Sequence, residues 1–142
     1  MNLRSVVVGV DGSANGRRAL EWALGVAAPV GARVVAVHAL GLLTHVGGHT
    51  VPVEGRRDEI TAAFRDDWCG PTLAGARPDE CTIHDGTPTD VLLAAARTYA
   101  ADLVVVGARG AGGHALLGST STRVVHEAGR PVLVVPESDD RD

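Results

Sequence analysis

Short apolar runs of strand length alternate with helical patterns along most of the chain. The runs cover residues 6–10, 33–39, 81–84, 103–107 and 131–135. The first run does not alternate between apolar and polar positions, which is typical of a strand covered on both faces. Helical spacing of apolar residues separates the runs. The order βαβαβαβαβ predicts an α/β fold with a doubly wound five-stranded parallel sheet, right-handed crossovers and helices on both faces.

Capping and turn signals indicate where the helices begin and where the chain is irregular. Ser13 is a candidate N-cap for the first helix, and Thr87 opens a later one. Apolar residues at three- to four-residue spacing predict another helix over residues 60–68. Residues 41–55 are rich in glycine and proline, so we expect a loop there.

Length and composition indicate one compact domain. A chain of 142 residues buries about 70% of its unfolded surface, and we assign residues 1–136 to a single domain and 137–142 to an acidic tail. Aromatic residues make up only 3% of the chain, so Val, Leu and Ala must build the core. A pocket for a nucleobase would therefore use backbone groups and aliphatic walls.

Charge and cysteine content exclude several classes of function. The net charge of −4 without a basic run argues against a nucleic-acid partner. No 18-residue apolar segment is present, so we expect no membrane span and a cytoplasmic location. All 13 basic residues are arginine, which rules out the lysine of a P-loop or of a receiver domain. Cys69 and Cys81 lack zinc-site spacing and are expected to be free thiols.

The segment 101–136 carries the strongest chemical signal. An apolar strand leads into a glycine-rich loop, and then Gly118, Ser119, Thr120 and Ser121 open a helix. Glycines let a ligand approach the backbone, and the unpaired N–H groups of a helix N-terminus favour an anion. The combination predicts a phosphate site. The alternative is a flexible turn with an ordinary Ser/Thr cap.

The parallel sheet brings further candidate residues to the same edge. In open α/β sheets, ligands bind beyond the carboxyl ends of the strands, at the switch point in strand order. Asp11 follows the first strand and Gly107 ends the fourth, so the two converge despite their separation in sequence. Asp11 could bind a divalent ion carried by a polyphosphate, or it could only cap the first helix together with Ser13.

Evidence for catalysis is weak. No Ser-His-Asp or Cys-His arrangement follows from the spacing, and we interpret His38 as a core histidine within a strand. The pair His45 and His49 is not on a helix and does not predict a metal site. A match to a dinucleotide fingerprint at 110–115 is out of place, because only one strand follows it.

Five separated segments occur in an order typical of one family. They are residues 6–13, Val37-His38, 102–110, Gly118-Ser119 and 131–136. In this order they resemble the universal stress protein family. The resemblance implies an adenine nucleotide alpha hydrolase-like, flavodoxin-like three-layer sandwich. It also implies a stress-response regulator that binds ATP or a related adenine nucleotide, with Mg or Mn as an accompanying ion.

The resemblance also assigns site residues. The nucleotide-binding branch carries the pattern G-2x-G-9x-G-[ST]. Here Gly107 and Gly110 match the first half and Gly118-Ser119 the second, with seven residues between the halves instead of nine. Asp11 and Ala39 match positions that flank adenine and ribose, and Asp11 is the metal candidate. The full predicted nucleotide site consists of Val10, Asp11, Ser13, Ala39, Val106, Gly107, Gly110, Gly118, Ser119, Thr120 and Ser121.

The family further implies a homodimer paired through the fifth strand. That strand contains Val132, Leu133, Val134 and Val135, and an exposed apolar edge strand invites a partner. Two other functions stay open at this point. One is a family member that binds no nucleotide and acts through protein contacts, which the shortened loop favours. The other is a slow ATP hydrolase or phosphotransferase, against which stand the missing lysine and the lack of an evident general base.

Overall fold

The computed structural model describes residues 2–41, 43–46, 49–52, 54–70, 76–108 and 118–137. Gly110 and the rest of the glycine loop lie outside the described residues, as does the tail beyond residue 137. The elements are β1 (Ser5–Gly9), α1 (Ala14–Ala27), η1 (Ala28–Val30), β2 (Arg33–Leu40), β3 (Leu43–Val46), β4 (His49–Pro52), α2 (Arg57–Ala63), η2 (Phe64–Trp68), β5 (Glu80–Asp85), α3 (Pro88–Thr98), β6 (Leu103–Gly107), α4 (Ser119–Glu127) and β7 (Val132–Val135).

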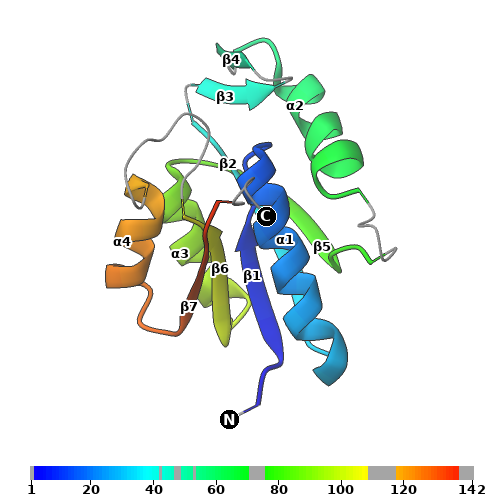
Figure 1. The fold of residues 1–142 in the computed structure, drawn as a ribbon. Coiled ribbons are helices and arrows are strands. Elements are labelled where there is room, and N and C mark those ends of the chain that lie inside the picture. Colours follow the sequence, from blue (N-terminus) through cyan, green and yellow to red (C-terminus); the bar gives the residue numbers. More distant parts are fainter. Residues whose placement is uncertain are drawn as a thin grey trace.

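The predicted five-stranded parallel sheet is confirmed, with the order β5-β2-β1-β6-β7 (Figure 1). Central strand β1 pairs with β2 on one side and with β6 on the other, so that Val6 lies opposite both Val34 and Leu103. The chain moves outward from β1 through β2 to β5, then crosses to the opposite side of β1 for β6 and β7. The switch point of this sheet therefore lies between β1 and β6.

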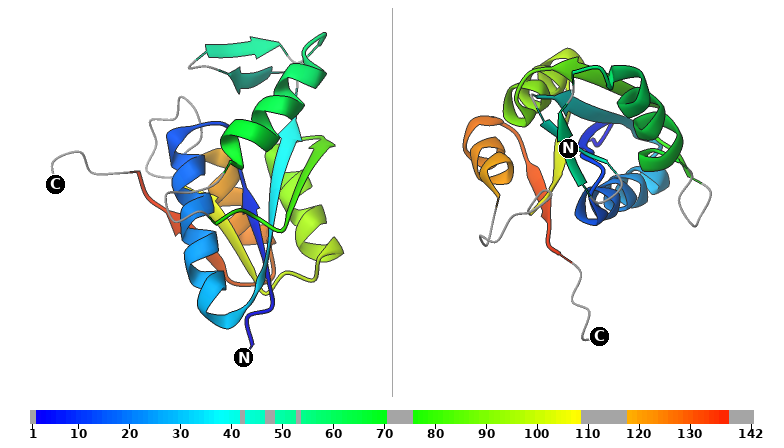
Figure 2. Two further views of the ribbon diagram at one scale, coloured as in Figure 1. Left: turned by 90° about the vertical axis from the view of Figure 1, so that its right-hand side faces the viewer. Right: turned by 90° about the horizontal axis from the view of Figure 1, so that it is seen from above.

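Helices cover both faces of the sheet, as predicted (Figure 2). On one face, Val6 and Val8 of β1 pack with residues of α1 and with Phe64 of η2. On the other face, Val7 packs with residues of α3 and α4. Successive residues of a strand point to opposite faces, so a strand buried on both sides needs an uninterrupted apolar run. This explains why β1 shows no polar alternation.

The region 41–55, predicted to be a loop, contains an antiparallel hairpin, and the prediction was wrong there. Strands β3 and β4 pair from Leu43 opposite Pro52 to Val46 opposite His49. The hairpin lies with α2 above the carboxyl ends of the parallel strands (Figures 1 and 2). The strand signal was present in the β-branched residues of the two segments and in the Gly47-Gly48 pair between them, a common hairpin signal. The high glycine and proline content of the region led instead to the loop prediction.

The two predicted helix caps are present. The Ser13 hydroxyl accepts a hydrogen bond from the Gly16 N–H at 3.0 Å, and the Thr87 hydroxyl accepts one from the Asp90 N–H at 3.2 Å. The helix predicted over 60–68 differs at its end, because residues 64–68 form a π-turn, η2, after α2. Within the described part of the chain, no helix is both long and apolar enough to cross a membrane.

Candidate functional site

A tight turn after β1 orients Asp11 at the carboxyl edge of the sheet. Asp11 Oδ1 accepts hydrogen bonds from the Ser13 N–H at 3.0 Å and from the Ser13 hydroxyl at 2.5 Å. The Ser13 hydroxyl in turn caps α1 through Gly16. The predicted capping partnership of the two side chains is therefore present. Among the described residues Asp11 Oδ2 accepts no hydrogen bond, so it is the carboxylate oxygen available to a cation.

The first turn of α1 joins this turn to the end of β6. A Cβ added to Gly16 would lie 2.6 Å from Asp11 Oδ1, and a Cβ added to Gly107 would lie 2.6 Å from Asn15 Nδ2. Both distances are far shorter than ordinary van der Waals contact. Asp11 and Gly107 therefore pack against one helical turn on either side of the switch point, and this is the convergence that the sequence predicted.

Hydrogen bonds at Ala108, the residue after β6, join the end of this strand to α4 and to β7. The Ala108 carbonyl accepts hydrogen bonds from the Gly118 N–H at 2.5 Å and from the Ser121 hydroxyl at 2.8 Å. The Ala108 N–H donates to the carbonyl of Val135 in β7 at 2.7 Å. These bonds hold the start of α4 beside the switch point, although only seven residues separate Gly110 from Gly118.

The N-terminus of α4 has the form expected of an anion site. Its first intrahelical bond runs from the Thr122 N–H to the Gly118 carbonyl, so the N–H groups of residues 119–121 precede the ladder. Gly118 is the N-cap and supplies no capping side chain, whereas hydroxyls cap α1 and α3. Ser119 is exposed and Thr120 half-buried, while the buried Ser121 hydroxyl is engaged with Ala108. Ser119 and Thr120 are thus the hydroxyls placed to reach a ligand.

The residues predicted to border a nucleobase are apolar but lie on both faces of the sheet, Val10 in the cluster with α1 and Val106 and Ala39 in the cluster with α3. Val10 and Val106 are buried and Ala39 is half-buried near the end of β2, opposite His84. The Val10 N–H donates to the Val37 carbonyl at 2.9 Å, and the Val10 carbonyl accepts from His38. Val10 therefore offers mainly hydrocarbon to the edge of the sheet.

His38 is a core histidine, as predicted, but it also supports the site. His38 Nδ1 lies 2.7 Å from the Val10 carbonyl oxygen. Because a carbonyl oxygen only accepts a hydrogen bond, Nδ1 carries the proton. The ring packs edge-on against Trp68 and tilted against Phe64, with centroids 4.9 and 5.8 Å away. Burial lowers the pKa of His38, and the Val10 carbonyl and the Asp11 charge oppose that shift only in part. A neutral His38 is therefore the stable form.

The described residues contain no cluster of three or more His, Cys, Asp or Glu side chains that could hold a metal ion. Asp85 at the end of β5 pairs with Arg57 of α2 at 2.7 Å. A metal ion at Asp11 would therefore need its other ligands from outside the described side chains.

The sequence analysis did not predict one residue of the candidate site, Asn15. Its side chain is buried between α1 and the end of β6. A signal was present, because Asn15 stands four residues before Ala19 and eight before Ala23, at the head of the buried face of α1.

Residues 2–136 of the chain match one family. The model of the universal stress protein family matches residues 2–136. A relative from Thermus aquaticus, named as the universal stress protein in the QAH/OAS sulfhydrylase 3′ region, is 33% identical over 134 residues, covering 93% of this chain and 98% of the relative. The chain belongs to the universal stress protein family.

Solved structures of universal stress proteins have the same fold. One, described as a universal stress protein in complex with cAMP, is 28% identical, covers 95% of this chain and 98% of its own, and gives a TM-score of 0.68. A universal stress protein from Lactobacillus plantarum is 21% identical, covers 95% of this chain and 99% of its own, and gives a TM-score of 0.71. The family and the three-layer α/β fold are thus established for this chain.

In this universal stress protein, Gly107→Ala should destabilise the fold by about 1–3 kcal/mol, because the new methyl group overpacks Asn15. Urea unfolding measures the loss. Gly25→Ala is the matched control, since a Cβ there meets nothing within 4 Å and alanine favours a helix by about 0.5–1 kcal/mol. In an Asn15→Ala background the cost of Gly107→Ala should shrink. An undiminished cost in that background would show that Asn15 is not the obstacle.

Proposed function

We propose that this universal stress protein binds an adenine nucleotide, with ATP as the expected ligand, between the carboxyl ends of β1 and β6. It acts as a ligand-responsive regulator of the stress response. The observation that carries this proposal is the N-terminus of α4, which has no capping side chain and is fastened beside the switch point through Ala108. Backbone N–H groups and the positive end of the helix dipole both favour phosphate there.

The rest of the edge is suited to a nucleoside. Half-buried Ala39 provides aliphatic contact for a base, with buried Val10 and Val106 supporting the edge from within the core, which agrees with the scarcity of aromatic residues. Asp11 Oδ2 is available to a Mg²⁺ or Mn²⁺ ion that arrives with the phosphates. Within the family, the relative described as a complex with cAMP, at 28% identity, supports an adenine nucleotide as the ligand class.

A regulatory role is favoured over fast catalysis. The chain has no lysine to stabilise charge at the phosphates. Asp11, the acid at the switch point, already accepts two hydrogen bonds at Oδ1 from Ser13. The competing function is a protein that works through protein contacts without a nucleotide, and the spacing of seven residues favours it. Direct measurement of nucleotide affinity separates the two.

Gly118→Val should weaken ATP binding at least tenfold and leave the fold intact, as measured by titration calorimetry. Gly118 has φ −72° and ψ 167°, which any residue can adopt, so a side chain there restricts ligand approach without backbone strain. Tenfold corresponds to about 1.4 kcal/mol, modest for one charge-assisted hydrogen bond. Thr122→Val, an isosteric change at an exposed position of the same helix, should leave affinity unchanged. Equal affinity in both variants would remove the phosphate role of this turn.

Asp11→Asn should weaken ATP binding about tenfold with Mg²⁺ present and less than about twofold without it, since the amide binds a hard cation poorly. The melting temperature should barely move, because the amide oxygen can still accept the bonds from Ser13. Calorimetric titrations with and without Mg²⁺ make the comparison. Equal losses under both conditions would leave Asp11 with a structural role alone.

We also propose that the protein is a homodimer paired through β7. This edge strand has β6 as its one neighbour in the sheet, and its first three residues are only half-buried. The helices on either side of it, α1 and α4, both contact β7 and expose large apolar side chains, Trp22 at 52% and Val125 at 47%. A second copy of β7 would satisfy the open strand edge and cover both side chains.

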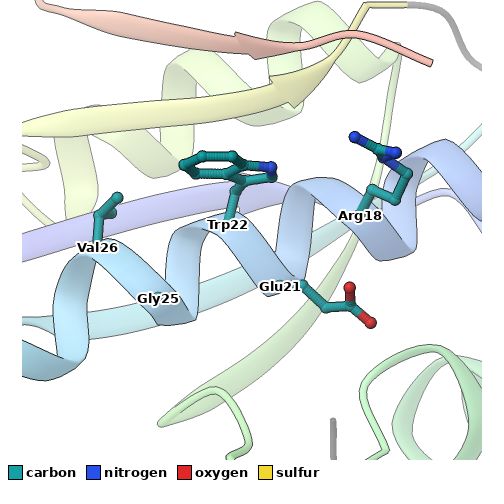
Figure 3. A pocket seen from close by; sticks show the side chains of 5 residues that line it. All are labelled: Arg18, Glu21, Trp22, Gly25 and Val26. Carbon is teal, nitrogen blue, oxygen red and sulfur yellow. The ribbon is translucent and has the colours of Figure 1, made fainter. Parts of the chain in front are cut away.

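The surface beside β7 also has room for a partner. A hollow of about 440 Å³ along α1 is lined by Arg18, Glu21, Trp22, Gly25 and Val26. Figure 3 shows Arg18, Trp22 and Val26 pointing from α1 toward the strands. The hollow lies on the exposed flank of α1, so we assign it to the subunit interface and not to the nucleotide site.

Val134→Lys should shift the protein toward monomer at micromolar concentration, because an edge-strand lysine opposes strand pairing. Analytical ultracentrifugation of both proteins measures the change. Val30→Lys is the matched control, since Val30 is 60% exposed in η1, away from β7. A Val134→Lys variant that stays dimeric, or a native protein that sediments as a monomer at high concentration, would place the contact elsewhere or remove it.

A further inference from the structure

The two cysteines, separated by twelve positions in sequence, meet in the folded protein. Cys69 follows η2 and is fully buried, and Cys81 lies near the start of β5, partly exposed. Both are free thiols, and they are neighbours close enough for the Cys81 side chain to raise the pKa of Cys69. They share one side of the sheet, because Cys81 packs against the same apolar cluster that contains Cys69.

The backbone around each thiol is fixed by separate interactions. The Cys69 N–H donates to the Phe64 carbonyl at 2.9 Å, which closes the π-turn. Arg17 of α1 donates to the carbonyls on either side of Cys69, those of Trp68 at 3.0 Å and Gly70 at 2.8 Å. Cys81 is fixed by its register opposite Ala36 of β2. The positions of the two thiols are therefore set by the packing of α1, η2 and the sheet.

We propose that Cys69 and Cys81 are a redox modification site, in which a hydroperoxide converts the two thiols to an intramolecular disulfide and a thiol reductant restores them. The site is independent of the proposed nucleotide site and does not use its residues. Neighbouring thiols within one packed cluster can form a disulfide once their side chains bring the two sulfurs to bonding distance.

The difference in burial sets the order of the steps. Burial and the neighbouring Cys81 thiol raise the pKa of Cys69 well above its ordinary range, while Arg17 and Arg77 oppose the shift. Cys69 is therefore a poor first nucleophile, since the thiolate is the reactive form. The partly exposed Cys81 sulfur attacks the distal peroxide oxygen, the O–O bond breaks, and an alcohol (water, for hydrogen peroxide) leaves. Cys81 is now a sulfenic acid.

The second step joins the sulfurs of the two neighbouring side chains. The Cys69 sulfur attacks the Cys81 sulfur, the S–O bond breaks, and the departing hydroxide takes the Cys69 proton as water. Overall, two thiols and one hydroperoxide give a disulfide, an alcohol and water. The proximity of Cys69 favours this step over further oxidation of Cys81, because the resolving thiol is a near neighbour.

Metal binding is the other use of a thiol pair, and the surroundings do not favour it. Structural zinc takes four ligands from Cys, His or carboxylate side chains. Within the part of the chain that the structure describes, no third such side chain joins the two thiols. The pair is thus suited to two-electron oxidation.

The test treats the reduced full-length protein with stoichiometric hydrogen peroxide and follows free thiols and intact mass. We expect both thiols to disappear together, a mass loss of two hydrogen atoms, a yield of intrachain disulfide independent of protein concentration, and full recovery with dithiothreitol. A protease that cleaves after Glu59 and Glu80 separates the cysteines, so the two peptides should remain joined until reduction. A disulfide between two chains, a sulfinic acid at Cys81 beside an intact Cys69 thiol, or unreacted thiols would each overturn the proposal.

Two alanine variants test the order of the steps. In Cys69→Ala, Cys81 should accumulate a sulfenic acid that dimedone traps. In Cys81→Ala, the buried Cys69 should react at least about tenfold more slowly than Cys81 does in the native protein. Native-like circular dichroism of each variant is checked first, and either variant alone suffices. An equally fast reaction of Cys69 in Cys81→Ala would contradict the assigned order, and so would the absence of a dimedone adduct in Cys69→Ala.

Discussion

The close contact between the first turn of α1 and the ends of β1 and β6 is the constraint on which the rest of the edge depends. Glycine at 16 leaves space for the Asp11 carboxylate, and glycine at 107 leaves space for the Asn15 side chain. With α1 this close, Asp11 and the end of β6 lie against one helical turn. The glycine at the end of β6 therefore serves helix packing as well as any approach of a ligand.

Polar groups at this edge are arranged in pairs that fix the backbone. Ser13 connects Asp11 to the start of α1, and Ala108 connects β6, β7 and α4 through three hydrogen bonds. His38 holds the Val10 carbonyl from within the core. The N-terminus of α4 stands apart from this pattern, because its N-cap is a glycine. Backbone N–H donors beside a rigid sheet edge are well placed to bind an anion, because little reorganisation has to precede binding.

Two other features of the fold lie away from that edge. The apolar strand β7 ends the sheet between two helices that expose Trp22 and Val125. Toward the other edge strand, β5, Arg17 ties the end of η2 to α1 and so holds Cys69 in the apolar cluster on which Cys81 packs. The β1–β2 core between them consists of small aliphatic residues packed on both faces. A regular sheet of this kind keeps the proposed nucleotide edge, the proposed subunit edge and the thiol pair physically separate.

The sequence alone determined the five strands, their parallel arrangement, the edge position of the last strand, the caps at Ser13 and Thr87, and the family. These follow from apolar periodicity, local turn chemistry and motif order, all of which act over a few residues. Only the tertiary structure decided the rest. The β3–β4 hairpin depends on pairing that glycine and proline content obscured, and the roles of Asn15, Ser121 and the two thiols depend on contacts across different elements. Such contacts are set by strand register and helix packing, which bring together residues that no local pattern in the chain connects.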